Sequence, residues 1–370
     1  MQAPEDCSSK ILLHHLLLTA LIVWLSSIAS RSTSIVPSTM ATSSVAGLWN
    51  RLTEEDPIGD TANADRDTTV LWTQSKESGI YVDIRLPKDS PGLSLEAAKD
   101  IAKRPSALAG SIDRKLLPYL DVLMRHKSFA GVLDVKPGDT TAGNAIFNDP
   151  TLKKLVDDPK AIIPLCTCFW RRDIDFQPPT GGLDIGVCAS AATADENLWL
   201  RETGADADYA EDWSRPESTT KGPFMVLQLV DGDRMGFWVR AAERFAYAVG
   251  RTTNEEKGGL SARVHKCVGK SLAEATQELA SSDEERLDMV GSYVCVVGLI
   301  NDKNEWVIHR SINPELVGCV LAGDSALSCS RLEKEGDTNV VQTIRTVDGN
   351  ELKRTWKIVE MSPQCALPLS

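Results

Sequence analysis

Two short strand–turn–strand units, about one domain apart, constrain the fold of this chain most strongly. The first runs from residues 69–74 through a turn of Ser, Lys and Gly to residues 80–85. The second runs from residues 224–230 through Asp-Gly-Asp to residues 235–240. Each unit joins two runs rich in apolar, β-favouring residues across a polar turn, which is the pattern of a β-hairpin. The sequence therefore predicts antiparallel β-structure that is used twice.

Short strands separated by tight turns continue to residue 360, and Asp348-Gly349 is a further strong hairpin signal. The alternating strand–helix pattern of a parallel sheet is missing. We therefore predict a mainly β fold of two antiparallel barrels, with helical insertions near residues 92–165 and 252–290. The chain has 370 residues, 42% of them hydrophobic, which is enough for two cores. The predicted parts are a linker at 40–67, a first barrel at 68–218, a second barrel at 219–361 and a tail at 362–370.

Residues 1–39 form a separate predicted segment. Residues 11–30 are largely apolar, and Ser27-Ile28-Ala29 resembles a small-residue cleavage site, as in a secretory signal or short anchor. Glu5 and Asp6 depart from the basic flank of such signals. The alternative is that translation starts at Met40. The first interpretation predicts the secretory pathway or a membrane tether through this segment alone, and the second predicts the cytoplasm.

The charge of the chain disfavours a role on nucleic acid. The formal net charge is -12, whereas a nucleic-acid site needs clustered Lys and Arg to displace phosphate counterions. In the body of the chain His126, His265 and His309 stand alone, without the paired His or Cys spacing of a metal site. The nine cysteines are scattered and are predicted to be buried thiols. The sequence therefore predicts no cofactor and no nucleic-acid partner.

Candidate ligand-binding residues come from arginines, tryptophans and tyrosines on the predicted strands. Arginines that end or punctuate strands could close a barrel and bind an anionic ligand, or could form structural ion pairs with Glu202, Glu211 or Asp212. Buried aromatic side chains could line a cup for a small apolar ligand or fill the core, because a barrel of about eight strands does one or the other. The candidates are Arg85, Trp170, Arg172, Tyr209, Trp213, Trp238, Tyr247 and Arg251.

An enzyme is the alternative function. Alternation from Trp170 places Arg172, Ile174 and Phe176 on its own face of a strand and Asp173 and Asp175 on the other. Two carboxylates on one strand face lie about 6–7 Å apart, a spacing compatible with acid–base catalysis. With Tyr209 or Tyr247 they would serve an isomerase or hydrolase acting in a barrel cavity. A solvated polar stripe explains the same pattern, and the motifs of nucleophilic catalysis are missing.

Several motifs resemble the HRI protein family. They are the strand at 80–85, the segment Phe-Trp-Arg-Arg-Asp-Ile-Asp-Phe-Gln-Pro-Pro at 169–179, Glu-Thr-Gly at 202–204, Glu-Asp-Trp-Ser-Arg-Pro at 211–216 and the second hairpin with the strand through Tyr247. The resemblance covers most of residues 68–360. The N-terminal leader and the insertions depart from the family pattern.

The resemblance implies two lipocalin-like, calycin-type barrels packed together, without an established enzyme activity. The family comprises fungal proteins named for interacting with a casein-kinase-I homologue, together with bacterial relatives. A protein kinase of the casein-kinase-I type is therefore an implied partner, and no docking motif identifies the contact. The leading prediction is a non-catalytic binding or adaptor protein that holds a small apolar or anionic ligand in a barrel, meets a protein partner, or does both.

Overall fold

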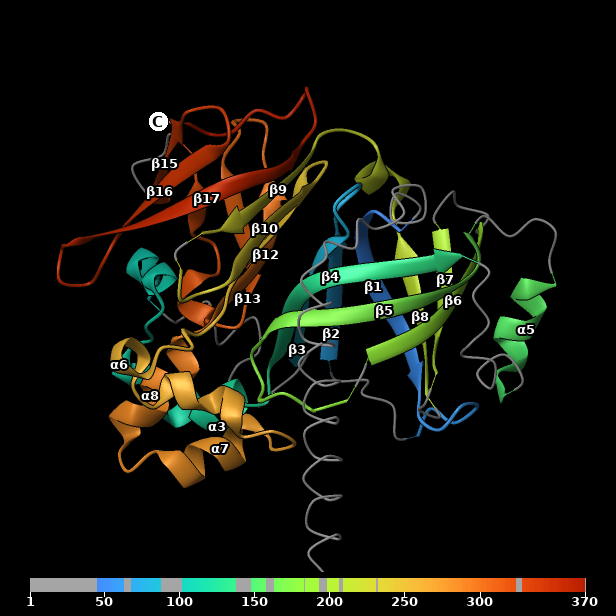
Figure 1. Ribbon diagram of the computed structural model, residues 1–370, viewed down its shortest axis with the longest axis horizontal. Coiled ribbons are helices and arrows are strands. Elements are labelled where there is room, and N and C mark those ends of the chain that lie inside the picture. The colour runs from blue at the N-terminus through green and yellow to red at the C-terminus, as the bar shows by residue number, and fades with distance from the viewer. Residues whose placement is uncertain are drawn as a thin grey trace, which may run out of the picture. The chain divides into compact units, whose positions relative to one another are not determined.

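The structure is a computed structural model (Figure 1). It describes residues 45–62, 68–87, 102–137, 148–157, 163–182, 184–192, 198–205, 209–230, 232–323 and 328–369. The signal or anchor predicted for residues 1–39 lies outside the described residues. Within these ranges, no helix has the length and apolar character needed to cross a membrane.

The first hairpin belongs to a closed barrel in which eight strands follow one another in sequence order, each antiparallel to the next (Figure 1). Alternate side chains of these strands point inward, as the two-residue period of a strand requires. They place Trp49, Trp72, Tyr81, Trp170 and Trp213 in one buried cluster. The strands are β1 (Gly47–Glu55), β2 (Thr68–Gln74), β3 (Ile80–Pro87), β4 (Lys127–Pro137), β5 (Ile163–Asp175), β6 (Asp184–Ala192), β7 (Leu198–Gly204) and β8 (Ala210–Arg215).

Strand β1 corrects the linker predicted over residues 40–67. Residues 47–55 of that segment pair with β2 on one side and β8 on the other, and so close the barrel. The segment is polar because one face of a barrel strand meets solvent. Its inward side chain Trp49 is fully buried and stacks on Trp72, with ring centroids 5.5 Å apart.

A β-bulge in β5 corrects the predicted faces of that strand. Ala130 of β4 pairs with Ile174, whereas the next residue, Gly131, pairs with Arg172, so Asp173 is the extra residue. The bulge reverses the alternation that follows. Ile174 and Phe176 therefore turn outward into a different core cluster from that of Trp170. A β-carbon at Gly131 would lie 1.9 Å from the Arg171 carbonyl oxygen, so glycine permits this close pairing.

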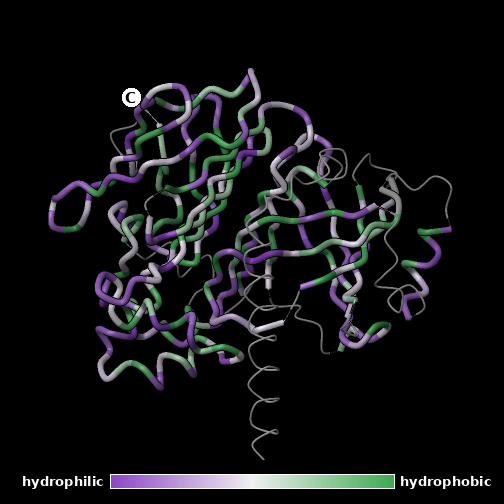
Figure 2. Tube along the Cα trace, viewed as in Figure 1, coloured by the Kyte–Doolittle hydropathy of each residue, from purple (hydrophilic) through white to green (hydrophobic). Residues whose placement is uncertain are grey.

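The second barrel contains the second hairpin and closes with nine strands, because β17 pairs with β9. Its strand pairs are antiparallel except that β14 and β15 run parallel. The prediction of two predominantly antiparallel barrels with helical insertions is confirmed. Figure 2 shows hydrophobic residues gathered on the strands of both barrels. The strands are β9 (Phe224–Leu229), β10 (Gly236–Ala241), β11 (Arg244–Val249), β12 (Val294–Ile300), β13 (Trp306–Ser311), β14 (Val320–Ala322), β15 (Ser328–Glu335), β16 (Asn339–Arg345) and β17 (Glu351–Met361).

Both barrels belong to one compact unit of the chain. Outward residues of the first barrel, such as Ile84 and Ile174, share a hydrophobic cluster with Phe237 and Val239 of the second. The Glu360 carboxylate of β17 also accepts hydrogen bonds from the three backbone N–H groups of residues 76–78, at 3.0–3.2 Å. The barrels are thus joined by apolar burial and by a charge-assisted contact.

Short helices fill the two insertions. In the described part of the first are the 3-10 helices η2 (Pro105–Ala109) and η3 (Arg114–Tyr119), with α3 (Leu120–Leu123) and α5 (Pro150–Val156). The 3-10 helix η4 (Glu217–Thr220) joins the barrels, and η6 (Pro314–Leu316) follows β13. The second insertion holds α6 (Glu255–Gly258), η5 (Ser261–Lys266), α7 (Leu272–Leu279) and α8 (Asp283–Gly291). Although η2 lies between β3 and β4 in the chain, its Ala107 and Leu108 belong to the core of the second barrel.

Candidate functional site

The first barrel contains a cavity of about 520 Å³, which we call the cup. Five of the eight predicted ligand-binding residues line it, and they come from three different strands or their ends. The lining residues are Glu54, Asp56, Asp83, Arg85, Phe129, Trp170, Arg172, Thr180, Asp184, Glu202, Tyr209, Glu211 and Trp213.

Alternation along the strands builds the cup in layers. On β3, Tyr81 belongs to the aromatic cluster, and the next inward side chains, Asp83 and Arg85, are charged. On β5, Trp170 is likewise followed by Arg172. The sequence thus places a charged layer beside an aromatic layer, because residues two apart on a strand share a face.

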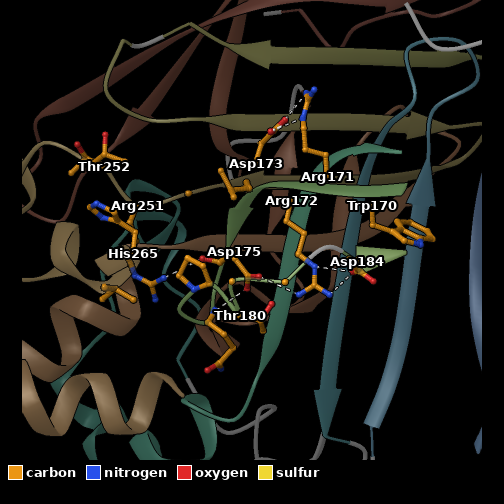
Figure 3. A pocket seen from close by; sticks show the side chains of 18 of the residues that line it. Trp170, Arg171, Arg172, Asp173, Asp175, Thr180, Asp184, Arg251, Thr252 and His265 are labelled. Atoms are coloured by element: carbon orange, nitrogen blue, oxygen red, sulfur yellow. Dashed lines mark hydrogen bonds and ion pairs between the residues drawn. The ribbon is translucent and has the colours of Figure 1, made fainter. Parts of the chain in front are cut away.

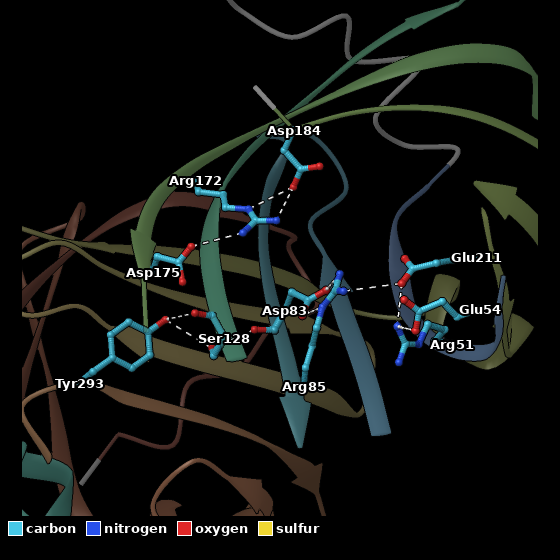
Figure 4. A network of polar contacts seen from close by, with 10 residues as sticks. All are labelled: Arg51, Glu54, Asp83, Arg85, Ser128, Arg172, Asp175, Asp184, Glu211 and Tyr293. Carbon is cyan, nitrogen blue, oxygen red and sulfur yellow. Dashed lines mark hydrogen bonds and ion pairs between the residues drawn. The ribbon is translucent and has the colours of Figure 1, made fainter. Parts of the chain in front are cut away.

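The guanidinium group of Arg85 is held by carboxylates. Its Nε lies 3.1 Å from Oδ1 of Asp83, and its Nη1 lies 3.6 Å from Oε1 of Glu211 (Figure 4). Glu211 also pairs with Arg51 at 2.7 Å. Asp83 is 2% exposed, and burial raises its pKa. Arg85 therefore takes part in a buried ion-pair network, as the structural interpretation of the strand-end arginines predicts.

The guanidinium group of Arg172 is likewise held by two carboxylates. Its Nη2 lies 2.6 Å from Oδ2 of Asp184, and its Nη1 lies 3.3 Å from Oδ2 of Asp175 (Figure 4). Both Arg172 and Arg85 also lie over the ring of Phe129, at 3.8 and 5.2 Å from its centroid. Their positive charges are thus compensated inside the barrel.

Glu202 of β7 has a different environment. It is 4% exposed, and its Oε1 accepts the indole N–H of Trp170 at 3.1 Å. Among the described residues, Glu202 makes no ion pair within 4 Å, in contrast to Asp83 and Glu211. Burial, followed by the charges of Glu211 and Asp184, raises the pKa of Glu202 well above 4.5. Glu202 is therefore a buried carboxyl group without a cationic partner.

Trp213 and Tyr209 complete the aromatic part of the cup. Trp213 is 1% exposed, and its indole N–H finds no hydrogen-bond acceptor in the described part of the chain. Burial raises the pKa of Tyr209, so its phenol remains protonated at neutral pH. A buried indole N–H without an acceptor is costly, and Trp238 and Trp306 of the second barrel share this feature in the described part of the chain.

The other predicted tryptophan and tyrosine lie elsewhere. Trp238 and Tyr247 are fully buried inside the second barrel, with their ring centroids 5.3 Å apart. Trp306 and Trp356 pack against the same Trp238 ring. The Tyr247 hydroxyl donates to Gln342 at 3.3 Å. Neither residue lines the cup, and their contacts are those of core packing, which the sequence left as an alternative.

Arg251 lines a second cavity of about 480 Å³, formed by β5, the β5–β6 turn and parts of residues 250–265 (Figure 3). This cavity shares Trp170, Arg172, Thr180 and Asp184 with the cup. Its guanidinium donates to the carbonyl oxygens of Met289 and Phe176, at 2.9 and 2.8 Å. Burial lowers its pKa to about 10. These carbonyl contacts link the insertion of the second barrel to β5, so Arg251 is not brought together with Arg85 in the cup.

The four predicted acid–base residues do not all meet in one cavity. Asp173 and Asp175 both line the second cavity, where Asp173 pairs with Arg171 at 2.9 Å and Asp175 pairs with Arg172 at 3.3 Å. Burial raises the pKa of Asp175 to about 6. Tyr209 lies in the cup and Tyr247 in the second barrel. The two carboxylates therefore share a cavity, but each is held in an ion pair with an arginine.

Sequence reasoning missed the part that carboxylates play in the cup lining. Asp83, Asp184 and Glu54 line the cup beside the predicted residues. The alternation of Tyr81, Asp83 and Arg85 was the available signal, since it places Asp83 on the face of Arg85. In the described ranges, no group of three or more His, Cys, Asp or Glu side chains is arranged to hold a metal ion.

Comparison with known proteins assigns no family. No protein-family model and no curated protein matches the sequence. Among solved structures, the crystal structure of an uncharacterised protein from Saccharomyces cerevisiae is similar over 85% of this chain and 98% of that chain. The two are 11% identical, with a TM-score of 0.42. This similarity identifies neither a family nor an activity.

Proposed function

We propose that this chain is a non-catalytic binding protein of the HRI type, whose first, lipocalin-like barrel holds a small molecule in the cup. The observation that carries the proposal is the difference between the two barrels. Both barrels have an aromatic core, but the first also has a partly open cavity of about 520 Å³ beside that core. Small-molecule sites usually have volumes of about 300–1,000 Å³ and combine aromatic walls with a few polar groups.

The distribution of titratable groups supports binding over acid–base catalysis. Each carboxylate of the proposed catalytic pair belongs to an arginine ion pair, and the two tyrosines lie in different barrels. General acid–base catalysis requires its groups within hydrogen-bonding reach of one substrate. The kinase partner implied by the family resemblance stays a prediction, to be tested by binding of a purified casein-kinase-I-type kinase.

Site-specific blocking tests the proposal. Thr180 is an exposed residue that lines both the cup and the second cavity, so Thr180→Trp would obstruct both. His265 is an exposed residue that lines only the second cavity, so His265→Trp is the matched control. Fragments that bind the wild type are identified by ligand-observed NMR, and any molecule that co-purifies is identified by native mass spectrometry.

The proposal expects binding to the wild type and to His265→Trp, and its loss in Thr180→Trp. Loss of binding in His265→Trp would move the site to the second cavity and contradict the proposal. A wild type that binds no fragment and carries no co-purified molecule would contradict it as well.

A further inference from the structure

The described residues of the cup carry more negative than positive groups. Six of their carboxyl groups line it, and the two guanidinium groups of Arg85 and Arg172 face them. Arg51 and Asp175 pair with these groups from outside the lining. With Asp175 and Arg51 included, seven carboxyl groups face three guanidinium groups. Even with Glu202 protonated, the described part of the cup keeps an excess of negative charge, which favours a positive ligand.

The arginines are poorly suited to bind an anion. Arg85 and Arg172 each contact two carboxylates, so an anionic ligand would have to displace those partners. Displacement would leave buried carboxylates unpaired, which is strongly unfavourable. The anionic ligand expected from the strand-end arginines is therefore disfavoured in the cup.

One buried polar group of the cup lacks a partner that a ligand could supply. Glu202 is only 4% exposed and has no cationic partner among the described residues. Trp213 on the neighbouring strand β8 is 1% exposed and also lines the cup. A molecule with a positive nitrogen would match Glu202.

The walls provide a surface for such a molecule. The cup lining includes the rings of Phe129, Trp170, Tyr209 and Trp213. Aromatic faces attract ammonium and guanidinium groups, and indole does so most strongly. The barrel already uses this interaction, since Arg172 lies 3.8 Å from the centroid of Phe129.

From the charge excess, the unpartnered Glu202 and the aromatic walls, we infer that the cup binds a small organic cation, an amine or guanidine on an aromatic or apolar body. This inference rests on the proposed function, because it names the ligand class for the same cavity. Glu202 would pair with the cationic nitrogen, and the indole of Trp213 would lie against the body of the ligand.

Isothermal titration calorimetry with three matched probes tests the inference. Tryptamine is the cation, tryptophol is its neutral analogue and indole-3-propionate is the anion. We expect tryptamine to bind more tightly than either analogue. Glu202→Gln keeps an acceptor for the Trp170 N–H but cannot carry a negative charge, so it should weaken tryptamine binding by about tenfold or more. Asp173→Asn is the control, because this carboxylate lies on β5 and pairs with Arg171 outside the cup, and it should bind like the wild type.

The outcomes separate this inference from the proposed function. Tighter binding of the anion or the neutral probe would overturn the cation inference and leave a ligand-binding cup. A ligand-binding cup also remains if none of the three probes binds but other fragments bind and are blocked by Thr180→Trp and not by His265→Trp. If no fragment of any charge binds the wild type, the cation inference and the proposed function both fail. Equal loss of tryptamine binding in Glu202→Gln and Asp173→Asn would contradict the role of Glu202.

Discussion

Gly186 of β6 lies directly against the carboxyl group of Glu202 on β7. A β-carbon at residue 186 would stand 2.7 Å from Oε1 of Glu202, closer than such atoms approach. The missing side chain leaves room for the 3.1 Å hydrogen bond from Trp170 to Glu202, which joins β5 to β7 across the intervening strand. The position of Glu202 in the cup therefore depends on the absence of a side chain at residue 186.

Gly186→Ala should displace the Glu202 carboxyl group. Because the group that must move is a side chain, we expect the free energy of unfolding to change by no more than about 1 kcal/mol. Tryptamine affinity should nevertheless fall about tenfold, since the carboxylate leaves its place. Calorimetry and urea denaturation measure the two quantities. Gly182→Ala is the control, because a β-carbon there would meet no atom within 4 Å, and an equal loss of affinity in both variants would contradict this prediction.

Binding of a cation should release a proton from Glu202. The pKa of this group is raised well above 4.5, first by burial and then by Glu211 and Asp184, while Arg85 acts in the opposite direction. A cation at Glu202 favours the ionised form, so affinity should increase as pH rises through the pKa of the free protein. Titrations in two buffers with different ionisation enthalpies measure the proton release. Glu202→Gln should remove it, and an unchanged release in that variant would assign the proton to another group.

Asp149→Ala should destabilise the first barrel. The Asp149 carboxylate is fully buried, accepts from Arg201 at 2.7 Å and caps the N-terminus of α5 through the N–H of Thr151. Removing one partner of a buried ion pair typically costs about 3–5 kcal/mol. Chemical denaturation measures the loss. Glu284→Ala is the control, because its pair with Arg114 is largely exposed and should contribute less than about 1 kcal/mol. A similar loss in both variants would contradict the predicted role of Asp149.

His126 should make the fold sensitive to acid. Its ring is buried, its Nδ1 donates to the Ile312 carbonyl at 3.2 Å, and burial lowers its pKa from 6.5 to about 4. As pH falls from about 6.5 to about 4, the unfolded chain takes up a proton that the folded chain does not. The free energy of unfolding therefore falls across this window, by at most about 3 kcal/mol from this group. His126→Asn should flatten the decline between pH 6.5 and 4, measured by urea denaturation. An unchanged slope would assign the decline to other groups.

Strand alternation predicted part of the site from the sequence. The two-residue period correctly placed Trp170 and Arg172 on one face, and both line the cup. The two-residue period failed beyond Arg172, because a bulge shifts the register there. The bulge depends on Gly131 of the neighbouring strand, whose missing β-carbon permits the close pairing of Gly131 with Arg172. A register shift of this kind is set by two strands together, so the sequence of β5 alone could not reveal it.

Glu211 was among the predicted partners of the strand-end arginines, but its pairing with Arg85 in particular could not be derived in advance, for a related reason. Arg85 meets Glu211 only because β3 and β8 face each other across a closed barrel, although 126 residues separate the two positions. Periodicity tells which face a side chain occupies, but it does not tell which residues lie opposite. Trp49 was missed because its strand is otherwise polar, which favoured a linker over an edge that closes the barrel.

The position of the 3-10 helix η2 matters for any attempt to express the two barrels separately. It lies between two strands of the first barrel, yet the carbonyl oxygen of Leu108 accepts from the buried Arg354 of the second, at 3.1 Å. Residues 219–361 expressed by themselves would lack this piece and would expose the guanidinium and the core around it. The two barrels are thus interdependent halves of one folding unit, and a gene cut between them would yield fragments that need each other to become stable.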